Sequence, residues 1–259
     1  MNLFSRLPAY VFILLFLYCC NITFAQTADI HQEIDELKQG QQAIQRELQE
    51  IRSLLEKIAA QTERPLPPAG PAIKDVEFEI GDIPVKGDAA AKLILVEFTD
   101  YECPYCGRYV NETFPQIQKA YIDKGTIQYA VIDLPLPVHT KAPKAAEASH
   151  CAAEQGKFWE IHELMMSKQE MLGELTSYAV SLKLDVQKFD ECVNSGKYAD
   201  MVNRGVSLAR KLGVNAVPGF IIGRVDSSKP GKITGILFIT GAMPFAVFQT
   251  GLDAALASQ

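Results

Sequence analysis

Cys103 and Cys106 are separated by Pro104 and Tyr105, giving a Cys-Pro-Tyr-Cys motif. Two thiols at this spacing close a tight loop that favours reversible thiol–disulfide exchange. The motif follows an apolar run at residues 93–98, predicted as a buried strand, and opens a segment with helical periodicity. A thiol at a helix N-terminus meets unpaired N–H groups and the positive end of the helix dipole, which favour the thiolate. We therefore predict that Cys103 is an exposed nucleophile with a lowered pKa, and that Cys106 is the shielded resolving thiol.

Two other interpretations of this cysteine pair stay open. Half of a zinc site would need a second Cys-x-x-Cys or a His-x-x-x-His pair, and the sequence has neither, so we expect no metal. A permanent structural disulfide is the other, although the short spacing favours exchange.

The predicted elements that carry the motif follow an α/β order. Strands are predicted at residues 76–80, 93–98, 127–132, 220–222 and 236–239. Helical periodicity follows Cys106, fills residues 141–212 and returns at residues 244–256. Breaks in the long helical block are expected near Gly156, Gly173, Asp185 and Gly196. This order predicts an α/β fold with a helical insertion.

The run VEFTDYECPYC at residues 96–106 resembles the thioredoxin superfamily, and more closely its exported DsbA-like branch. Three further segments carry the resemblance: residues 152–159 at the start of the inserted helical domain, 213–220 at the cis-proline loop, and 241–245 at the last helix. The resemblance implies a thioredoxin-like fold over residues 74–259 with its helical insertion at about 141–212. It also implies a thiol–disulfide oxidoreductase whose redox group is its own disulfide, without a further cofactor.

The resemblance assigns roles to residues outside the motif. Pro218 matches the cis-proline that faces the cysteines, so the backbone of Val217 is expected to pair with a bound peptide; an ordinary trans turn is the alternative. Glu97 stands six residues before Cys103, where the family often has a buried acid. Such an acid has a raised pKa and relays a proton to and from Cys106; an exposed glutamate at the edge of the sheet is the alternative.

Further assignments concern single side chains. Tyr105 matches the residue that tunes the redox potential, and the lack of a cationic histidine there predicts a somewhat less oxidising couple. His139 falls where relatives often carry a histidine, although we favour a surface residue at a helix start. Cys151 and Cys192 lie where some relatives have cysteines, and two remaining thiols usually pair in an oxidising compartment. We predict that they form a structural disulfide, with two buried free thiols as the alternative.

The N-terminal sequence predicts export. Arg6 precedes an apolar run at residues 10–20, which is short of the ~20 residues that span a bilayer. Small residues at positions 23 and 25 predict a signal peptide at residues 1–25, cleaved after Ala25. The expected location is periplasmic or otherwise exported. Membrane attachment through an uncleaved N-terminus, or through a lipid on Cys20, is the alternative.

Residues 29–61 show a heptad pattern typical of a coiled coil. Apolar residues and one glutamine fill its a and d positions: Ile30, Ile34, Leu37, Gln41, Ile44, Leu48, Ile51, Leu55 and Ile58. Isoleucine at d with leucine at a favours a trimer or tetramer through residues 30–58 over a dimer. An amphipathic helix that packs on its own domain is the alternative. A Pro-rich linker at residues 62–73 separates this segment from the globular domain.

Composition and charge narrow the function further. Apolar residues make up 48% of the 259, and the net charge of −6 argues against nucleic acid as a partner. The expected partners are exported cysteine-containing proteins and a membrane redox partner. Val217 before the proline favours an oxidase, whereas an oligomer favours an isomerase, and we weight isomerase or dual activity slightly higher. A non-catalytic oligomeric envelope protein that only binds clients is the alternative.

Overall fold

The computed structural model describes residues 37–53, 76–229 and 231–258. The chain divides into two units, Met1–Leu66 and Pro67–Gln259. The predicted signal peptide with Cys20, and the predicted linker at residues 62–73, lie outside the described residues.

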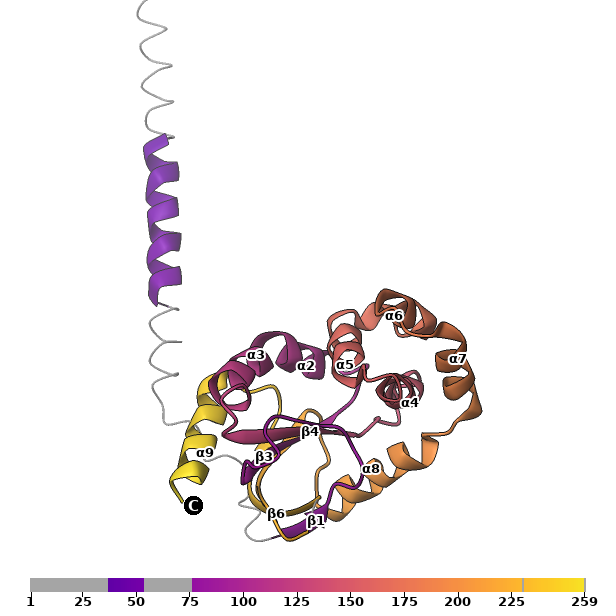
Figure 1. Cartoon of the computed structure of the whole chain (residues 1–259). Coiled ribbons are helices and arrows are strands. Elements are labelled where there is room, and N and C mark those ends of the chain that lie inside the picture. The colour runs from indigo at the N-terminus through magenta and orange to yellow at the C-terminus, as the bar shows by residue number, and fades with distance from the viewer. Residues whose placement is uncertain (1–36, 54–75, 230, 259) are drawn as a thin grey trace, which may run out of the picture. The chain divides into compact units, whose positions relative to one another are not determined.

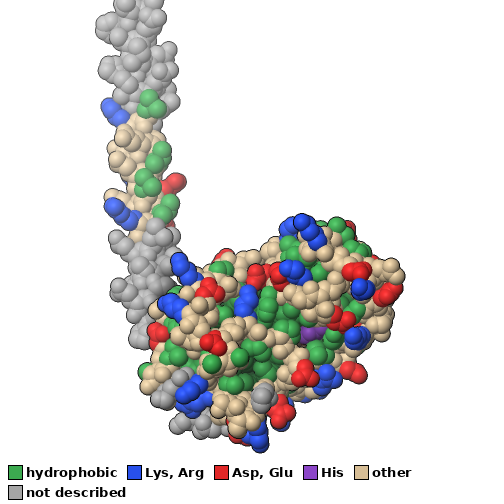
Figure 2. All heavy atoms as spheres, in the orientation of Figure 1, with side chains coloured by type: hydrophobic (Ala, Val, Ile, Leu, Met, Phe, Trp, Pro, Cys, Tyr) green, Lys and Arg blue, Asp and Glu red, His purple; other side chains and the backbone are tan. Residues whose placement is uncertain are grey.

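In the first unit, residues 37–53 are helical and exposed throughout (Figure 1). Apolar side chains form a row along this helix in Figure 2. They are 53–73% exposed and comprise Leu37, Ile44, Leu48 and Ile51. The described part of the predicted coiled coil is therefore helical, and its association with other copies stays a prediction.

The second unit is built on a six-stranded mixed sheet in the order β1-β6-β5-β3-β4-β2. The strands are β1 (Val76–Glu79), β2 (Val85–Lys86), β3 (Leu93–Thr99), β4 (Ile127–Asp133), β5 (Gly219–Val225) and β6 (Lys232–Thr240). β3 and β4 are parallel, and the other neighbouring pairs are antiparallel. Every residue of β3 is buried, which explains its unbroken apolar run. β2 was not predicted, because two residues are too short to show a period.

The helices connect the strands in two groups. The helical crossover from β3 to β4 consists of α2 (Pro104–Arg108), the π-helical turn η1 (Tyr109–Thr113), α3 (Phe114–Ile117) and a second π-helical turn η2 (Gln118–Ile122). The chain from β4 to β5 consists of α4 (Ala142–Ala153), α5 (Phe158–Ser167), the 3-10 turn η3 (Gln169–Met171), α6 (Leu175–Ser181), α7 (Val186–Ser195) and α8 (Ala199–Lys211). α9 (Phe245–Ala257) follows β6.

The predicted breaks in the helical block fall where expected. Asp185 caps α7 by accepting a hydrogen bond from the Lys188 backbone N–H at 3.2 Å. Gly196 ends the same helix with φ at +69°, a conformation that glycine adopts without steric cost. Gly156 has φ at +71° in the turn between α4 and α5.

The alternation of side chains along β3 separates two cores. Leu93 and Leu95 belong to the cluster with the α2–η2 crossover and α9, whereas Ile94 and Val96 belong to the cluster with α8. Since successive side chains point to opposite faces, Glu97 lies on the face that the cysteine-bearing helix covers. Helices cover both faces of the sheet in Figure 1.

α8 lies within the range predicted as insertion, yet it packs on the sheet. Gly205 of α8 approaches β4 so closely that a Cβ there would lie 2.4 Å from the Asp133 carbonyl oxygen. The helical insertion therefore consists of α4 to α7. The remaining helix of residues 141–212, α8, covers one face of the sheet.

Candidate active site

The Cys-Pro-Tyr-Cys motif forms the turn from β3 into α2. Cys103 is the N-cap residue, with an extended backbone at φ −76° and ψ 117°, and Pro104 occupies the first helical turn. The backbone N–H groups of Cys106 and Gly107 donate to the Cys103 carbonyl at 3.0 and 3.2 Å. Both cysteines are free thiols.

The two thiols have opposite acidities. The Cys106 thiol donates to Cys103 sulfur, and with the N–H groups of Tyr105 and Cys106 it lowers the pKa of Cys103 to about 6. Burial raises the pKa of Cys106, and the nearby Cys103 and Glu97 raise it further. Near neutral pH the outer cysteine is therefore the thiolate and the inner one the thiol.

Cys103 was predicted to be exposed, and in the structure it is only 5% exposed. Its Sγ lies 3.7 Å from the carbonyl oxygen of Val217, in the loop before β5. The sequence pattern did not show this cover, because the covering residue is 114 positions away. The Val217–Pro218 peptide bond is cis.

Glu97 lies beneath the cysteines and is completely buried. Its carboxylate accepts a hydrogen bond from the hydroxyl of Tyr129 on β4. Burial raises the pKa of Glu97 to about 7, and the Tyr129 bond opposes this shift. The hydroxyls of Thr99 and Tyr109 also act at this carboxylate: Thr99 lowers the pKa of Glu97, and Tyr109 interacts with the Tyr129 hydroxyl.

A second acid, Asp100, organises the rim of the site. Its buried carboxylate accepts hydrogen bonds from the backbone N–H groups of Glu102 and Leu136, at 2.8 and 2.7 Å. The Nδ1 of His139 lies 2.7 Å from the same carboxylate. Burial lowers the pKa of His139, but its hydrogen bond and ion pair with Asp100 outweigh burial and raise it. His139 therefore contacts the active-site loop, rather than being a simple surface residue at a helix start.

Tyr105 stands outside these contacts. Its ring is 59% exposed, and the Arg108 guanidinium lies 5.2 Å from its centre. Arg108 also donates to the Ala242 carbonyl at 3.2 Å. The exposed ring is therefore available to a molecule that approaches Cys103.

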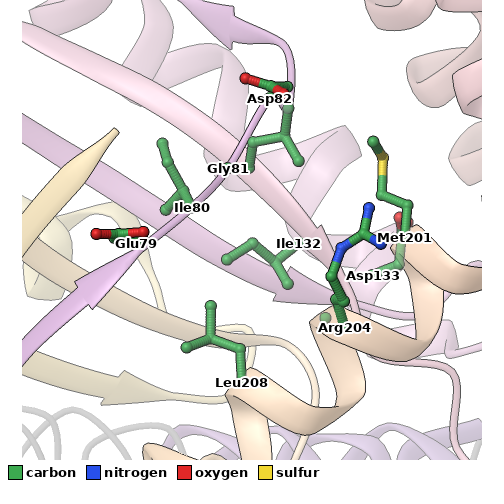
Figure 3. Close-up of a pocket in the computed structure, with 11 residues that line it drawn as sticks. Glu79, Ile80, Gly81, Asp82, Ile132, Asp133, Met201, Arg204 and Leu208 are labelled. Atoms are coloured by element: carbon green, nitrogen blue, oxygen red, sulfur yellow. The ribbon is translucent and has the colours of Figure 1, made fainter. Parts of the chain in front are cut away.

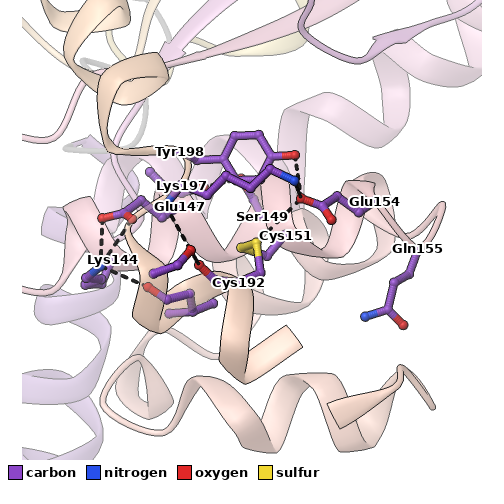
Figure 4. The surroundings of a disulfide bond; sticks show 12 residues. Lys144, Glu147, Ser149, Cys151, Glu154, Gln155, Cys192, Lys197 and Tyr198 are labelled. Carbon is purple, nitrogen blue, oxygen red and sulfur yellow. Dashed lines mark hydrogen bonds and ion pairs between the residues drawn. A yellow bond between two sulfur atoms is a disulfide. The ribbon is translucent and has the colours of Figure 1, made fainter. Parts of the chain in front are cut away.

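The second cysteine pair lies within the helical insertion (Figure 4). Cys151 on α4 and Cys192 on α7 form a disulfide that closes a separation of 41 residues. Trp159 of α5 is partly buried and packs on Tyr129 of β4, with ring centres 5.6 Å apart. It thus joins the insertion to the sheet.

A cavity of about 500 Å³ lies against the α8 face of the sheet (Figure 3). Ile80, Asp82, Ile132, Arg204 and Leu208 are among its lining residues, and neither active-site cysteine is. Across residues 37–53, 76–229 and 231–258, no group of three or more His, Cys, Asp or Glu side chains has a metal-binding arrangement.

The structure brings together the residues that the sequence predicted for the site, namely the two cysteines, Glu97 and the proline loop. The prediction missed two contributors, Tyr129 and Asp100, both of which act across the sheet or between loops. Asp100 stands three residues before Cys103, and an acid so close to the motif was the one available signal.

Comparison with known proteins identifies the family. The family model described as Thioredoxin matches residues 80–236. A variant of Wolbachia pipientis alpha-DsbA1 is 25% identical, with a TM-score of 0.60, covering 69% of this chain and 92% of that chain. Oxidised BdbD from Bacillus subtilis is similar in fold, with a TM-score of 0.60, 24% identity and coverage of 71% and 99%. The chain belongs to the thioredoxin family and is a DsbA-like member of it.

Two curated relatives bear on function. Disulfide bond formation protein D of Bacillus subtilis is 30% identical over 148 residues, which are 52% of this chain and 65% of that protein. Na(+)/H(+) antiporter NhaA 3 of Salinispora tropica is 36% identical over 141 residues, 53% of this chain. The match spans about a fifth of the antiporter's length. In the part of this chain that the structure describes, no helix has the length and apolar character needed to cross a membrane.

Proposed function

We propose that the protein is an exported thiol–disulfide oxidoreductase that exchanges disulfides with cysteine-containing client proteins through Cys103 and Cys106. The observation that carries this proposal is the opposite acidity of the two thiols. A pKa of about 6 makes Cys103 a thiolate at neutral pH, while Cys106 keeps its proton. Disulfide exchange needs two thiols of different acidity, because the thiolate attacks the client disulfide first and the second thiol reacts only after the mixed disulfide has formed.

The reaction proceeds in two displacements. The Cys103 thiolate attacks one sulfur of a client disulfide, forms a mixed disulfide and releases the other client sulfur as a thiolate. Cys106 then loses its proton and attacks Cys103 sulfur, which releases the reduced client and leaves a Cys103–Cys106 disulfide. The reverse sequence oxidises a client dithiol, and a membrane redox partner would then accept the electron pair through its own disulfide.

Glu97 is proposed to take the proton from Cys106 in the second displacement. A pKa of about 7 leaves its carboxyl partly ionised at neutral pH, as a general base requires. Its influence on the pKa of Cys106 supports their proximity. The backbone of Val217 lies beside the Cys103 sulfur, and we propose that an extended client peptide pairs with it through main-chain hydrogen bonds.

We propose isomerisation as the main or joint activity, through a trimer or tetramer formed by residues 30–58. The exposed apolar row on residues 37–53 needs a partner surface, and other copies of this chain carry the same row. Glu47 and Arg52, at g and e positions, pair between neighbouring helices of a parallel bundle. Tethering several active sites raises their local concentration, so a client released by one is recaptured by another.

The proposed location is the periplasm or another exported compartment. The Cys151–Cys192 disulfide in the structure supports an oxidising environment, and the sequence at residues 1–25 supports export. Retention of the N-terminus, or a lipid on Cys20, would add a membrane anchor.

Two assays test the function. The mature protein should reduce insulin with a thiol donor and should refold a protein with scrambled disulfides. The Cys106→Ala variant should accumulate mixed disulfides at Cys103, since the resolving thiol is gone. A protein that binds unfolded clients but fails both assays would instead be the non-catalytic binding protein.

The oligomer has its own test. Light scattering of the mature protein should give a trimer or tetramer, and a chain starting at residue 62 should be monomeric. The monomer should still reduce insulin but refold scrambled substrate poorly. A monomeric full-length protein, or a truncated protein that isomerises equally well, would contradict the coiled-coil argument.

A further inference from the structure

The side chain of Gln169 reaches from the helical insertion to the backbone of the active-site turn. It lies in η3, and its Nε2 donates to the carbonyls of Tyr101 and Cys103 at 2.7 and 2.9 Å. Glu102 and the nucleophile Cys103 lie between these two carbonyl groups in the chain. One amide group therefore fixes two peptide planes in the turn from β3 to α2.

The insertion packs closely against the first turn of α2. A Cβ at Gly107 would lie 2.7 Å from Gln169 Oε1 and 2.9 Å from the Met166 carbonyl oxygen, so only glycine fits here. One turn further, the Asn111 amide donates to the Gly107 carbonyl at 2.8 Å and to the Met166 carbonyl at 3.4 Å. The side-chain amides of Gln169 and Asn111 therefore bridge the insertion and the helical segment that follows Cys103.

Asp100 also supports this turn, since its carboxylate accepts from the Glu102 N–H at 2.8 Å and its carbonyl from the Cys103 N–H at 3.1 Å. These bonds hold N–H groups of the turn, whereas Gln169 holds its carbonyl groups. Within the described part of the chain, no side chain caps the N-terminus of α2, and the helix extends for only five residues before the π-helical turn η1. The N–H groups of Tyr105 and Cys106 stabilise the Cys103 thiolate, and such bonds weaken steeply when the donor turns away. Whether these N–H groups point at the Cys103 sulfur depends on the orientation of the peptide planes that precede them.

We propose that Gln169 is a positioning residue through which the helical insertion sets the reactivity of Cys103. This inference rests on the proposed role of Cys103 as the nucleophile. It gives the insertion a function in the chemistry of the site, because the insertion supplies the donor that holds the thiolate-binding turn. The side chain does not touch the client sulfur and acts only through the backbone of Cys103.

The test compares Gln169→Met, which keeps the volume of the side chain and removes its donors, with Gln155→Met as a matched control. Gln155 also bonds to backbone, donating to the Asp185 carbonyl at 3.2 Å and accepting from its N–H at 2.8 Å, within the same insertion. The pKa of Cys103 is measured in the full reduced chain by thiolate absorbance against pH. The redox equilibrium with glutathione is measured alongside.

Gln169→Met should raise the pKa of Cys103 by about one unit, which is the scale of one lost hydrogen bond. Alkylation of Cys103 below pH 6 should slow about tenfold, and the glutathione equilibrium should shift toward the disulfide form. Gln155→Met should leave all three unchanged. Gln169→Ala, which also deletes the amide and adds no bulk against Gly107, should change them in the same direction and serves if Gln169→Met does not fold.

A Gln169→Met protein with unchanged pKa and glutathione equilibrium would overturn the proposal, even if its melting temperature fell. The same pKa shift in Gln155→Met would overturn it as well, because the effect would then be general. These readouts need no client. Failure of the wild-type protein in the insulin and refolding assays is therefore a separate result that concerns the proposed function alone.

Discussion

The two cysteine pairs of this protein share one domain and differ in all the surroundings that govern reactivity. Cys103 and Cys106 lie within one turn of α2 and are free thiols. Cys151 and Cys192 lie 41 residues apart and join α4 to α7 as a disulfide. The first pair is placed at a helix N-terminus, where backbone N–H groups stabilise a thiolate.

The electrostatics differ in the same way. Two buried carboxyls, Glu97 and Asp100, face the first pair, and both influence the acidity of its thiols. The disulfide of the second pair closes a long loop, which is the arrangement that most restricts the unfolded chain. Both pairs consist of cysteine side chains, so the chemical group cannot explain why one pair is reactive and the other structural. Local geometry and nearby charge make the difference.

The largest expected effect separates the pairs by activity. Cys103→Ala should abolish insulin reduction, because Cys106 is a buried thiol with a raised pKa and Cys151 and Cys192 are joined in a disulfide. The double variant Cys151→Ala/Cys192→Ala should keep most of the activity at a temperature where it is folded. Measurable activity in Cys103→Ala would mean that the two pairs do not divide their roles.

The same double variant should have the largest effect on stability. Loss of a disulfide that closes about 40 residues costs about 3–4 kcal/mol in the chain-entropy model. Urea unfolding, followed by circular dichroism, measures this against Cys103→Ala, which should unfold near the wild-type midpoint. Equal midpoints for the two variants would contradict a structural role for the Cys151–Cys192 bond.

The sequence predicted the first pair and its fold because their signals are local. The apolar run of β3 and the motif after it are contiguous, and the period of two in the strand places Glu97 toward α2. The breaks at Asp185 and Gly196 were equally local, since a cap and a left-handed glycine each mark a helix end.

The contacts of the site were less predictable because they join distant parts of the chain. Tyr129 is 32 residues from Glu97, His139 is 39 from Asp100, and Gln169 is 66 from Cys103. The first depends on the register of β3 against β4, which the pattern of either strand alone does not determine. The others depend on how loops and the insertion close over the turn.

Glu97→Gln tests whether a buried carboxyl group distinguishes the reactive cysteine pair from the structural one. The pKa of Glu97 is about 7 in the fold against a reference of 4.5, so the folded state holds a proton that the unfolded state releases. Wild-type stability should therefore fall by about 3 kcal/mol between pH 4.5 and pH 7, at about 1.4 kcal/mol per pH unit. Glutamine does not titrate and should lack this contribution.

Unfolding free energies of wild type and Glu97→Gln, measured in the same redox state from pH 4.5 to 8, give this contribution as a difference. The common titration of Cys103 cancels to first order. The variant should also turn over more slowly while the pKa of Cys103 changes little. A pH-independent difference in stability would mean that Glu97 has an ordinary pKa, and unchanged turnover between pH 5 and 8 would contradict the proton relay.

The smallest expected effect concerns the hydroxyl that contacts this acid. Tyr129→Phe removes the hydrogen bond that favours the Glu97 carboxylate, so the pKa of Glu97 should rise further, by about one unit. The fall in stability should then extend to higher pH, and the acid side of the turnover profile, where the base becomes protonated, should move to higher pH as well. Tyr178→Phe is the matched control, since the hydroxyl that it removes donates to the Lys168 carbonyl at 2.6 Å and is not among the groups that shift the pKa of Glu97. If both variants gave the same profile, burial alone would set the acidity of Glu97, and the hydroxyl of Tyr129 would have no part in tuning the reactive pair.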